Sequence, residues 1–174
     1  MTEPLLWSHR VAEIPEAGLQ VTRSATAEER AAIARSLGIV ACDALTAEYL
    51  VRALGKGRYR LTGRLSARVT RECVVTLEPV EEALAEELDV AFWPNDSLPG
   101  PGGDEIEVSS VPEIEAIDHG QIEAGRVLFE ILSASLDPYP RKPGARFEWE
   151  DAAAEAPPGA GGPFAGLKNL KNES

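Results

Sequence analysis

The sequence predicts an α+β domain in which two main helices pack on an antiparallel, strongly bent or barrel-like sheet. Three observations support this class: strict two-residue alternation over residues 58–77, a capping box that opens a helix at Thr26, and apolar residues at helical spacing over 124–136. The chain has 174 residues and is 44% hydrophobic, which is enough for one ordinary core. We therefore expect one domain over residues 1–150.

The first part of the chain is expected to contain two strands and a helix. Strands are predicted over residues 5–11 and 18–24. Thr26 and Glu29 form the capping box, because the Thr26 hydroxyl accepts from the backbone at Glu29 and the Glu29 carboxylate reaches back. The helix ends at Gly38, since glycine takes the left-handed conformation that closes helices. Its apolar side is supplied by Ala31, Ala32, Ile33, Ala34 and Leu37.

The next part is expected to form a meander of long strands. Residues 39–54 are predicted to be extended, and residues 55–57 supply a hairpin turn. Odd positions from 59 to 77 are apolar apart from Gly63 and Arg71, and even positions from 58 to 72 are polar, which is typical of a strand with one buried face. The run is longer than a usual strand, so a bulge or bend is expected at Gly63. A turn at Glu78–Pro79 and an antiparallel return strand over 83–92 follow.

Beyond this meander the pattern becomes less regular. Residues 94–112 are predicted to be a mobile acidic loop, since the segment is rich in proline, glycine, aspartate and glutamate. Asp118 is expected to cap the second helix, inside which Gly125 allows close packing. Residues 146–149 suit a last short strand. Residues 151–174 are predicted to be a disordered tail with a short apolar and basic motif.

Charge is unevenly distributed along the chain. The net charge is −12, yet residues 1–71 carry 11 Lys/Arg against 7 Asp/Glu, whereas residues 72–125 carry 15 Asp/Glu and no Lys or Arg. The mean field therefore repels polyanions, while a local basic face remains available to bind one. We expect no DNA binding. The sequence has no apolar run long enough to span a membrane and no visible signal peptide, and with two cysteines a cytoplasmic location is expected.

The sequence contains no pattern typical of catalysis, a cofactor or a metal site. The two histidines lack metal-ligand spacing, and nucleotide-binding and nucleophile motifs are absent. We therefore expect a protein that is not an enzyme and needs no cofactor. Cys73 is interpreted as a small core residue on the inward side of its strand. One alternative is a generic protein-interaction module. The other is an enzyme with an unrecognised carboxylate site, for which Glu86 is the candidate because its parity places it among inward apolar residues.

A row of arginines on one strand is the first candidate binding surface. Four guanidiniums at even positions suit phosphate groups, and they belong to Arg58, Arg60, Arg64 and Arg68. The alternative is a solvated, ion-paired face, because Glu87 and Asp89 on the return strand are placed to pair with Arg68 and Thr70 or their diagonal neighbours.

Two further candidate surfaces lie near the C-terminus. The corner at residues 140–143 is stiffened by prolines and presents Arg141 and Lys142 beside Tyr139; the alternative is a plain loop. In the tail, the helical spacing of Phe164, Leu167 and Leu170 beside Lys168 and Lys171 suits a linear motif that folds on a partner; the alternative is a frayed end.

Three segments of the chain resemble the YceD family. They are CVVTLEPV at residues 73–80, LDPYPRKPG at 136–144, and Pro163-Phe164-Ala165 with Leu167 and Lys168. Members of this family are associated with accumulation of large-subunit ribosomal RNA. Many members have a CxxC in the first segment; here Thr76 replaces the second cysteine, which argues against a zinc or redox role.

The resemblance implies a non-enzymatic bacterial factor in large ribosomal subunit biogenesis, needed for 23S rRNA accumulation. Two modes of action fit the charge distribution. In one, the arginine row and the Arg141–Lys142 corner bind rRNA. In the other, the acidic stretch over residues 72–123 binds a basic large-subunit ribosomal protein. The sequence leaves the oligomeric state open.

Overall fold

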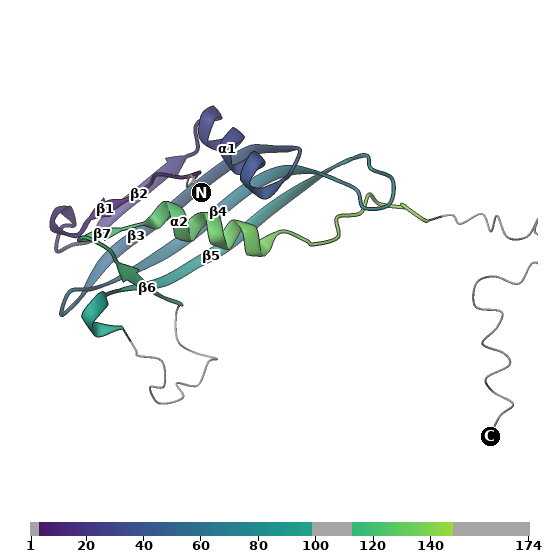
Figure 1. Cartoon of the computed structure of the whole chain (residues 1–174). Helices are drawn as coiled ribbons and strands as arrows, with labels where there is room; N and C mark the ends of the chain where they lie inside the picture. Colours follow the sequence, from purple (N-terminus) through teal and green to yellow (C-terminus); the bar gives the residue numbers. More distant parts are fainter. Residues whose placement is uncertain (1–3, 99–112, 148–174) are drawn as a thin grey trace, which may run out of the picture.

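The computed structural model describes residues 4–98 and 113–147 (Figure 1). Two helices accompany a five-stranded sheet of order β2-β3-β4-β5-β6 and a two-stranded sheet β1-β7. The elements are β1 (His9–Arg10), a 3-10 turn (Val11–Glu13), β2 (Leu19–Ser24), α1 (Ala27–Leu37), β3 (Ala41–Gly55), β4 (Arg58–Glu72), β5 (Pro79–Pro94), a 3-10 turn (Asn95–Ser97), β6 (Glu113–Ile117), β7 (Gln121–Ile122) and α2 (Ala124–Ser135).

The predicted α+β class is confirmed, but the predicted sheet was wrong in two respects. Strands β2 to β5 pair antiparallel, whereas β6 runs parallel to β5, so the sheet is mixed. The edge strands β2 and β6 do not pair with each other, so the sheet is open and not a barrel. Each edge strand is short, pairing with only six residues of β3 and five of β5 respectively, and is too short to close a cylinder with the long central strands.

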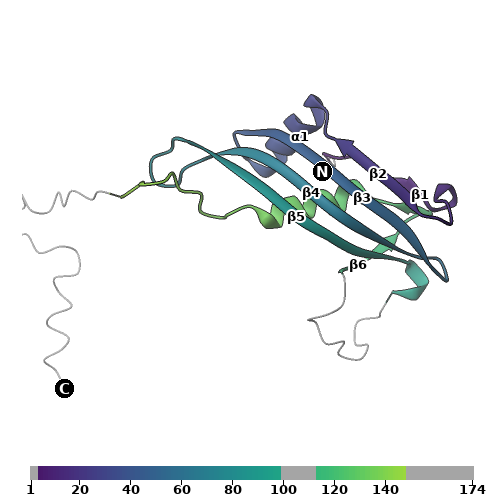
Figure 2. The same cartoon turned by 180° about the vertical axis from the view of Figure 1, so that it is seen from behind.

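Alternation along β4 sets the two faces of the sheet. The odd-numbered Leu61, Leu65 and Val69 are buried in the core, and the even-numbered polar residues around them are mostly exposed. Both helices pack on the buried side, and none of the described elements covers the other face of the sheet (Figures 1 and 2). The strand ends at Glu72 and not at Leu77 as the alternation predicted, because residues 73–78 close a turn.

Gly63 marks a close approach of two strands and not the expected bulge. Pairing is continuous there, with Tyr49 and Leu88 as the neighbours of Gly63 across the two ladders. A β-carbon on Gly63 would lie 2.1 Å from the carbonyl oxygen of Glu48. The irregularities of register fall in β3 instead, at residues 42–44 and 53–55.

The N-terminal segment is mostly a core anchor and not the predicted strand over residues 5–11. Only His9 and Arg10 form a strand, while Leu5 and Trp7 are fully buried against α2. The backbone N–H of Gly125 donates to the Trp7 carbonyl at 2.7 Å, and a β-carbon on Gly125 would lie 2.3 Å from the Leu5 carbonyl oxygen. The predicted close packing at Gly125 is therefore present.

The helix ends were predicted with mixed success. The capping box at Thr26 and Glu29 and the left-handed Gly38 are both present around α1. Asp118 does not cap α2, which was a wrong prediction: the N-cap is Glu123, and Asp118 instead bridges to Gln121 in the turn between β6 and β7. This turn and strand β7 therefore separate Asp118 from the start of α2.

Several predictions concern segments at the margins of the described chain. Residues 95–97 of the predicted mobile loop form a 3-10 turn, and the rest of that loop from residue 99 lies outside the described residues. Arg146 and Phe147 are not in a strand, and residues 148–149 and the tail over 151–174 also lie outside them. None of the described helices is both long and apolar enough to cross a membrane.

Candidate functional site

The arginine row lies on the uncovered face of the sheet, where two of its members form ion pairs. Arg60 donates two hydrogen bonds of 2.6 Å to Asp89, and the closest approach of Arg64 to Glu87 is 3.9 Å. The hydrogen bonds from Arg60 lower the pKa of Asp89. The expected partners of these carboxylates were Arg68 and Thr70 or their diagonal neighbours. This was wrong, because the strand turns back earlier than predicted, and Glu87 and Asp89 lie opposite Arg64 and Thr62.

The other two arginines of the row have different surroundings. Arg58 lies over the ring of Trp93, with its guanidinium carbon 3.9 Å from the ring centroid, which is a cation–π contact. Arg68 is exposed between Ala44 and Ala83 on the neighbouring strands, and it makes no ion pair within the described part of the chain. The row is therefore partly neutralised, and within the described residues Arg58 and Arg68 have no charged partner.

A second candidate site forms at the far end of the β4–β5 hairpin. We define the tip as the turn at residues 73–78 together with residues 138–142, which follow α2. The backbone N–H of Val74 donates to the Pro140 carbonyl at 2.9 Å, and Lys142 Nζ lies 2.9 Å from Glu78 Oε2. The tip projects beyond both helices at one end of the sheet (Figures 1 and 2). Two segments some 60 residues apart thus form one surface.

Cys73 holds the two segments of the tip together. Its Sγ accepts hydrogen bonds from the backbone N–H groups of Lys142 at 3.3 Å and Thr76 at 3.5 Å. These donors, that of Lys142 first, lower the pKa of the Cys73 thiol to about 6. The side chain is buried, as expected, but it lies outside the hydrophobic core cluster and is covered by polar backbone. The prediction of a small buried residue is therefore confirmed, but its surroundings differ from the apolar packing that was expected.

The stability of the tip should depend on pH through Cys73. A thiolate with a folded pKa near 6 and an unfolded pKa near 8.5 stabilises the folded state fully above about pH 8.5, and this contribution is lost as the pH falls through 6. We expect urea unfolding to show greater stability at pH 8.5 than at pH 5.5, with a smaller increment in Cys73→Ser. Equal increments in the two proteins would contradict the thiolate assignment.

The tip also exposes apolar side chains. Val74, Leu77 and Tyr139 are 46%, 72% and 68% exposed. Leu77 has a φ of 58°, a left-handed conformation that is unusual for a bulky residue. Closely spaced exposed apolar groups of this kind mark interaction surfaces. Of the residues predicted here, Tyr139 and Arg141 are exposed, and Lys142 is exposed but ion-paired.

Arg71 is a buried charged residue for which no role was predicted from the sequence. It lies on the inward side of β4 and is 8% exposed, with Nη2 at 2.9 Å from Glu82 Oε2. The angle is too poor for a hydrogen bond, and Arg71 Nε also lacks a partner among the described residues. The sequence indicated its burial, because Arg71 has an odd-numbered position among residues of β4 that are otherwise mostly apolar.

Other candidate residues are not brought together. Glu86 lies on the inward side of β5 but is only half-buried, so it is not the enclosed carboxylate that the enzyme alternative required. His9 Nε2 lies 2.7 Å from the Tyr49 hydroxyl, and burial lowers the pKa of His9. In the parts of the chain that are described, there is no group of three or more His, Cys, Asp or Glu side chains placed to hold a metal ion.

The candidate residues of the tail, Phe164, Leu167 and Lys168, lie outside the described residues. The structure therefore places two of the three segments that carry the family resemblance. Comparisons of the chain with protein-family models, with curated proteins and with solved structures found no match.

Proposed function

We propose that this protein is a non-enzymatic factor in biogenesis of the large ribosomal subunit, needed for 23S rRNA accumulation, and that its tip contacts the partner. The observation that carries the proposal is the meeting of two segments that resemble the YceD family. Residues 73–78 and 138–142 are joined by backbone hydrogen bonds and by the Lys142–Glu78 ion pair. Because the fold brings these distant segments together, the surface that they form indicates a binding site more strongly than either segment does alone.

A basic large-subunit ribosomal protein fits this surface better than rRNA does. The arginine row, which would bind phosphates, is partly neutralised by Asp89 and Glu87. The tip presents exposed leucine, valine and tyrosine side chains, which suit a protein interface. The net charge of −12 attracts basic proteins and repels RNA. In this proposal the carboxylates of residues 72–123 steer the basic partner toward the tip.

Removing the apolar groups of the tip should impair the proposed function. We expect a Leu77→Ser, Tyr139→Ser double variant, supplied to cells depleted of the native protein, to leave large subunits scarce relative to small ones. Both side chains are largely exposed, so the fold should be retained. The measurement is a ribosome profile on a sucrose gradient with quantification of 23S rRNA.

Leu54→Ser provides the matched control, because Leu54 is similarly exposed, at 57%, in the turn region at the opposite end of the sheet. This control should restore normal subunit ratios. Normal ratios in depleted cells that lack the protein altogether would overturn the assignment to large-subunit biogenesis. If the double variant restores normal ratios of large to small subunits while cells without the protein do not have them, the tip is not the surface that contacts the partner.

Purified protein can discriminate between the two partners. Arg141→Glu reverses an exposed charge without touching the Lys142–Glu78 ion pair. If the corner contacts phosphate, the variant should bind rRNA more weakly. The slope of the logarithm of the binding constant against the logarithm of the salt concentration should then become shallower by about one unit. If the partner is a basic ribosomal protein, the affinity for that protein should remain or rise. A pull-down that recovers neither kind of partner would contradict both modes.

A further inference from the structure

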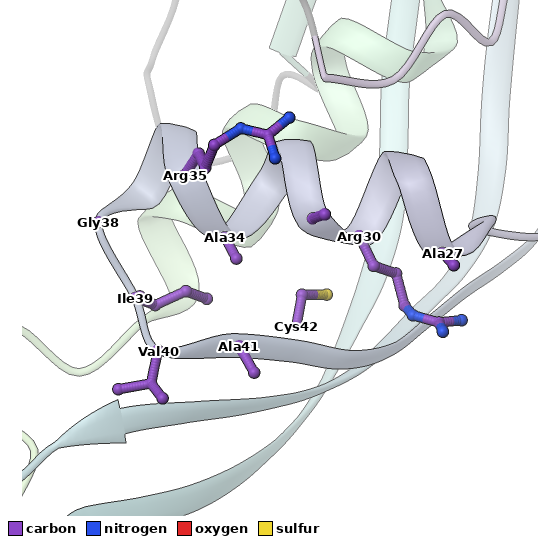
Figure 3. Close-up of a pocket in the computed structure, with 10 residues that line it drawn as sticks. Ala27, Arg30, Ala34, Arg35, Gly38, Ile39, Val40, Ala41 and Cys42 are labelled. Carbon is purple, nitrogen blue, oxygen red and sulfur yellow. The ribbon is translucent and has the colours of Figure 1, made fainter.

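A groove runs between α1 and the beginning of β3, away from the tip contacts described above. Figure 3 shows Ala34 pointing from the helix toward the strand and Cys42 pointing from the strand toward the helix. The groove has a volume of about 530 Å³, and a second pocket of about 450 Å³ shares Gly38, Ile39 and Val40 with it. The two pockets adjoin at these three residues, and we refer to them together as the channel.

The floor of this groove includes an open edge of the sheet. Strand β2 pairs with β3 only from Thr46 to Val51, so residues 41–45 of β3 have no strand on that side in the described chain. The Leu45 carbonyl already accepts from the Ala25 N–H at 2.9 Å, so the open part of the edge is residues 41–44. An edge without a partner strand presents backbone groups to an added strand.

Arginine side chains line both parts of the channel, and the Arg71 guanidinium is paired with Glu82 at 2.9 Å. Arg30 extends beside the strand at one end, where one of its donors reaches the Ala25 carbonyl at 3.2 Å (Figure 3). Arg71 lines the pocket at the other end, nearly buried and with Nε lacking a hydrogen-bond partner among the described residues. Glu72 is the one acidic residue that lines either pocket. The channel is thus locally basic in a protein whose net charge is −12.

We propose that this channel binds an extended acidic polypeptide segment, which adds as a strand to the open edge of β3. Strand addition satisfies the edge amides and carbonyls at the spacing of a peptide backbone, a match that a nucleic acid does not offer. Carboxylates of the segment would approach Arg30, whose side chain extends beside the strand. The small side chains of Ala31 and Ala34 leave space for the added strand. This inference does not depend on the proposed function.

A labelled peptide of alternating charge tests the proposal on the full chain. The probe is fluorescein-labelled Gly-Glu-Val-Glu-Val-Glu-Gly, measured by fluorescence anisotropy at low salt, with the lysine counterpart as the charge control. We expect the glutamate peptide to bind at least about tenfold more tightly than the lysine peptide. Methylating alternate backbone nitrogens of the glutamate peptide should also weaken binding about tenfold, because it removes the hydrogen bonds of strand addition. Equal binding of the methylated peptide would overturn strand addition.

Variants of the channel locate the site. Arg30→Glu should lower the affinity for the glutamate peptide about tenfold. Arg52→Glu, an exposed charge reversal elsewhere on β3, should leave this affinity nearly unchanged. The double variant Arg71→Met, Glu82→Leu removes the buried pair together, so that no uncompensated charge is left and the fold is retained. Because Arg71 and Glu82 neutralise each other, this variant should leave the affinity nearly unchanged. Equal effects of Arg30→Glu and Arg52→Glu, or preferential binding of a single-stranded oligouridylate at Arg30, would overturn the peptide assignment.

Discussion

Replacing Gly63 by alanine is expected to lower the free energy of unfolding by about 3 kcal/mol. General propensity predicts the opposite sign, because glycine inside a strand is less stable than alanine by about 0.5–1 kcal/mol. The structure reverses this expectation. Gly63 sits in the middle of β4, where the neighbouring strand β3 approaches its α-carbon directly.

The overlap at Gly63 involves backbone atoms that have little room to move. A β-carbon would lie 2.1 Å from the Glu48 carbonyl oxygen and 2.6 Å from the Tyr49 α-carbon. Tyr49 is itself fixed, since it is 1% exposed and its hydroxyl lies 2.7 Å from His9 Nε2. Burial raises the pKa of Tyr49 to about 12, so the ring stays neutral. Relief therefore requires the two long strands to separate locally.

Urea unfolding followed by circular dichroism measures this effect. Ser66→Ala is the matched control, because Ser66 lies on the same strand and its side chain is exposed on the uncovered face. This control should change stability by less than about 0.5 kcal/mol. A Gly63→Ala protein as stable as the native one would show that β3 and β4 are farther apart than described here.

Sequence periodicity was sufficient to predict β4 but not its end. Inward parity correctly assigned Leu61, Leu65 and Val69 to the core, because a strand with one buried face must alternate. The turn at residues 73–78 could not be inferred from parity, since Cys73 and Val75 continue the apolar pattern. Hydrogen bonds to residues 140 and 142, distant in the chain, help close it.

The position of that turn also determined which carboxylates pair with the arginine row. Turn position sets the register of a hairpin, so an earlier turn moved Glu87 and Asp89 from the expected Arg68 and Thr70 to Arg64 and Arg60. One irregularity did have a sequence signal. The buried Cys42 and Leu45 are three residues apart, which breaks the two-residue period and indicates the bulge beside the groove.

Replacing Trp7 by alanine is expected to cost about 4 kcal/mol of stability, the largest effect among these predictions. Trp7 is fully buried in the core cluster and contacts both helices. Its indole Nε1 donates to Glu29 Oε1 at 2.8 Å, at the start of α1, and its carbonyl accepts from Gly125 at the start of α2. Its loss therefore leaves a cavity between the two helices and the sheet.

Trp7→Phe separates packing from the hydrogen bond. Phenylalanine keeps most of the apolar volume but donates nothing to Glu29, so the loss of stability should be smaller than in Trp7→Ala. Burial alone would raise the pKa of Glu29, but hydrogen bonds from the Thr26 backbone, from Trp7 and from the Thr26 hydroxyl lower it overall. NMR titration should therefore show a higher Glu29 pKa in Trp7→Phe than in the native protein. Since Glu29 belongs to the capping box of α1, an unchanged pKa would mean that Trp7 fixes this helix, and the groove beside it, through packing alone.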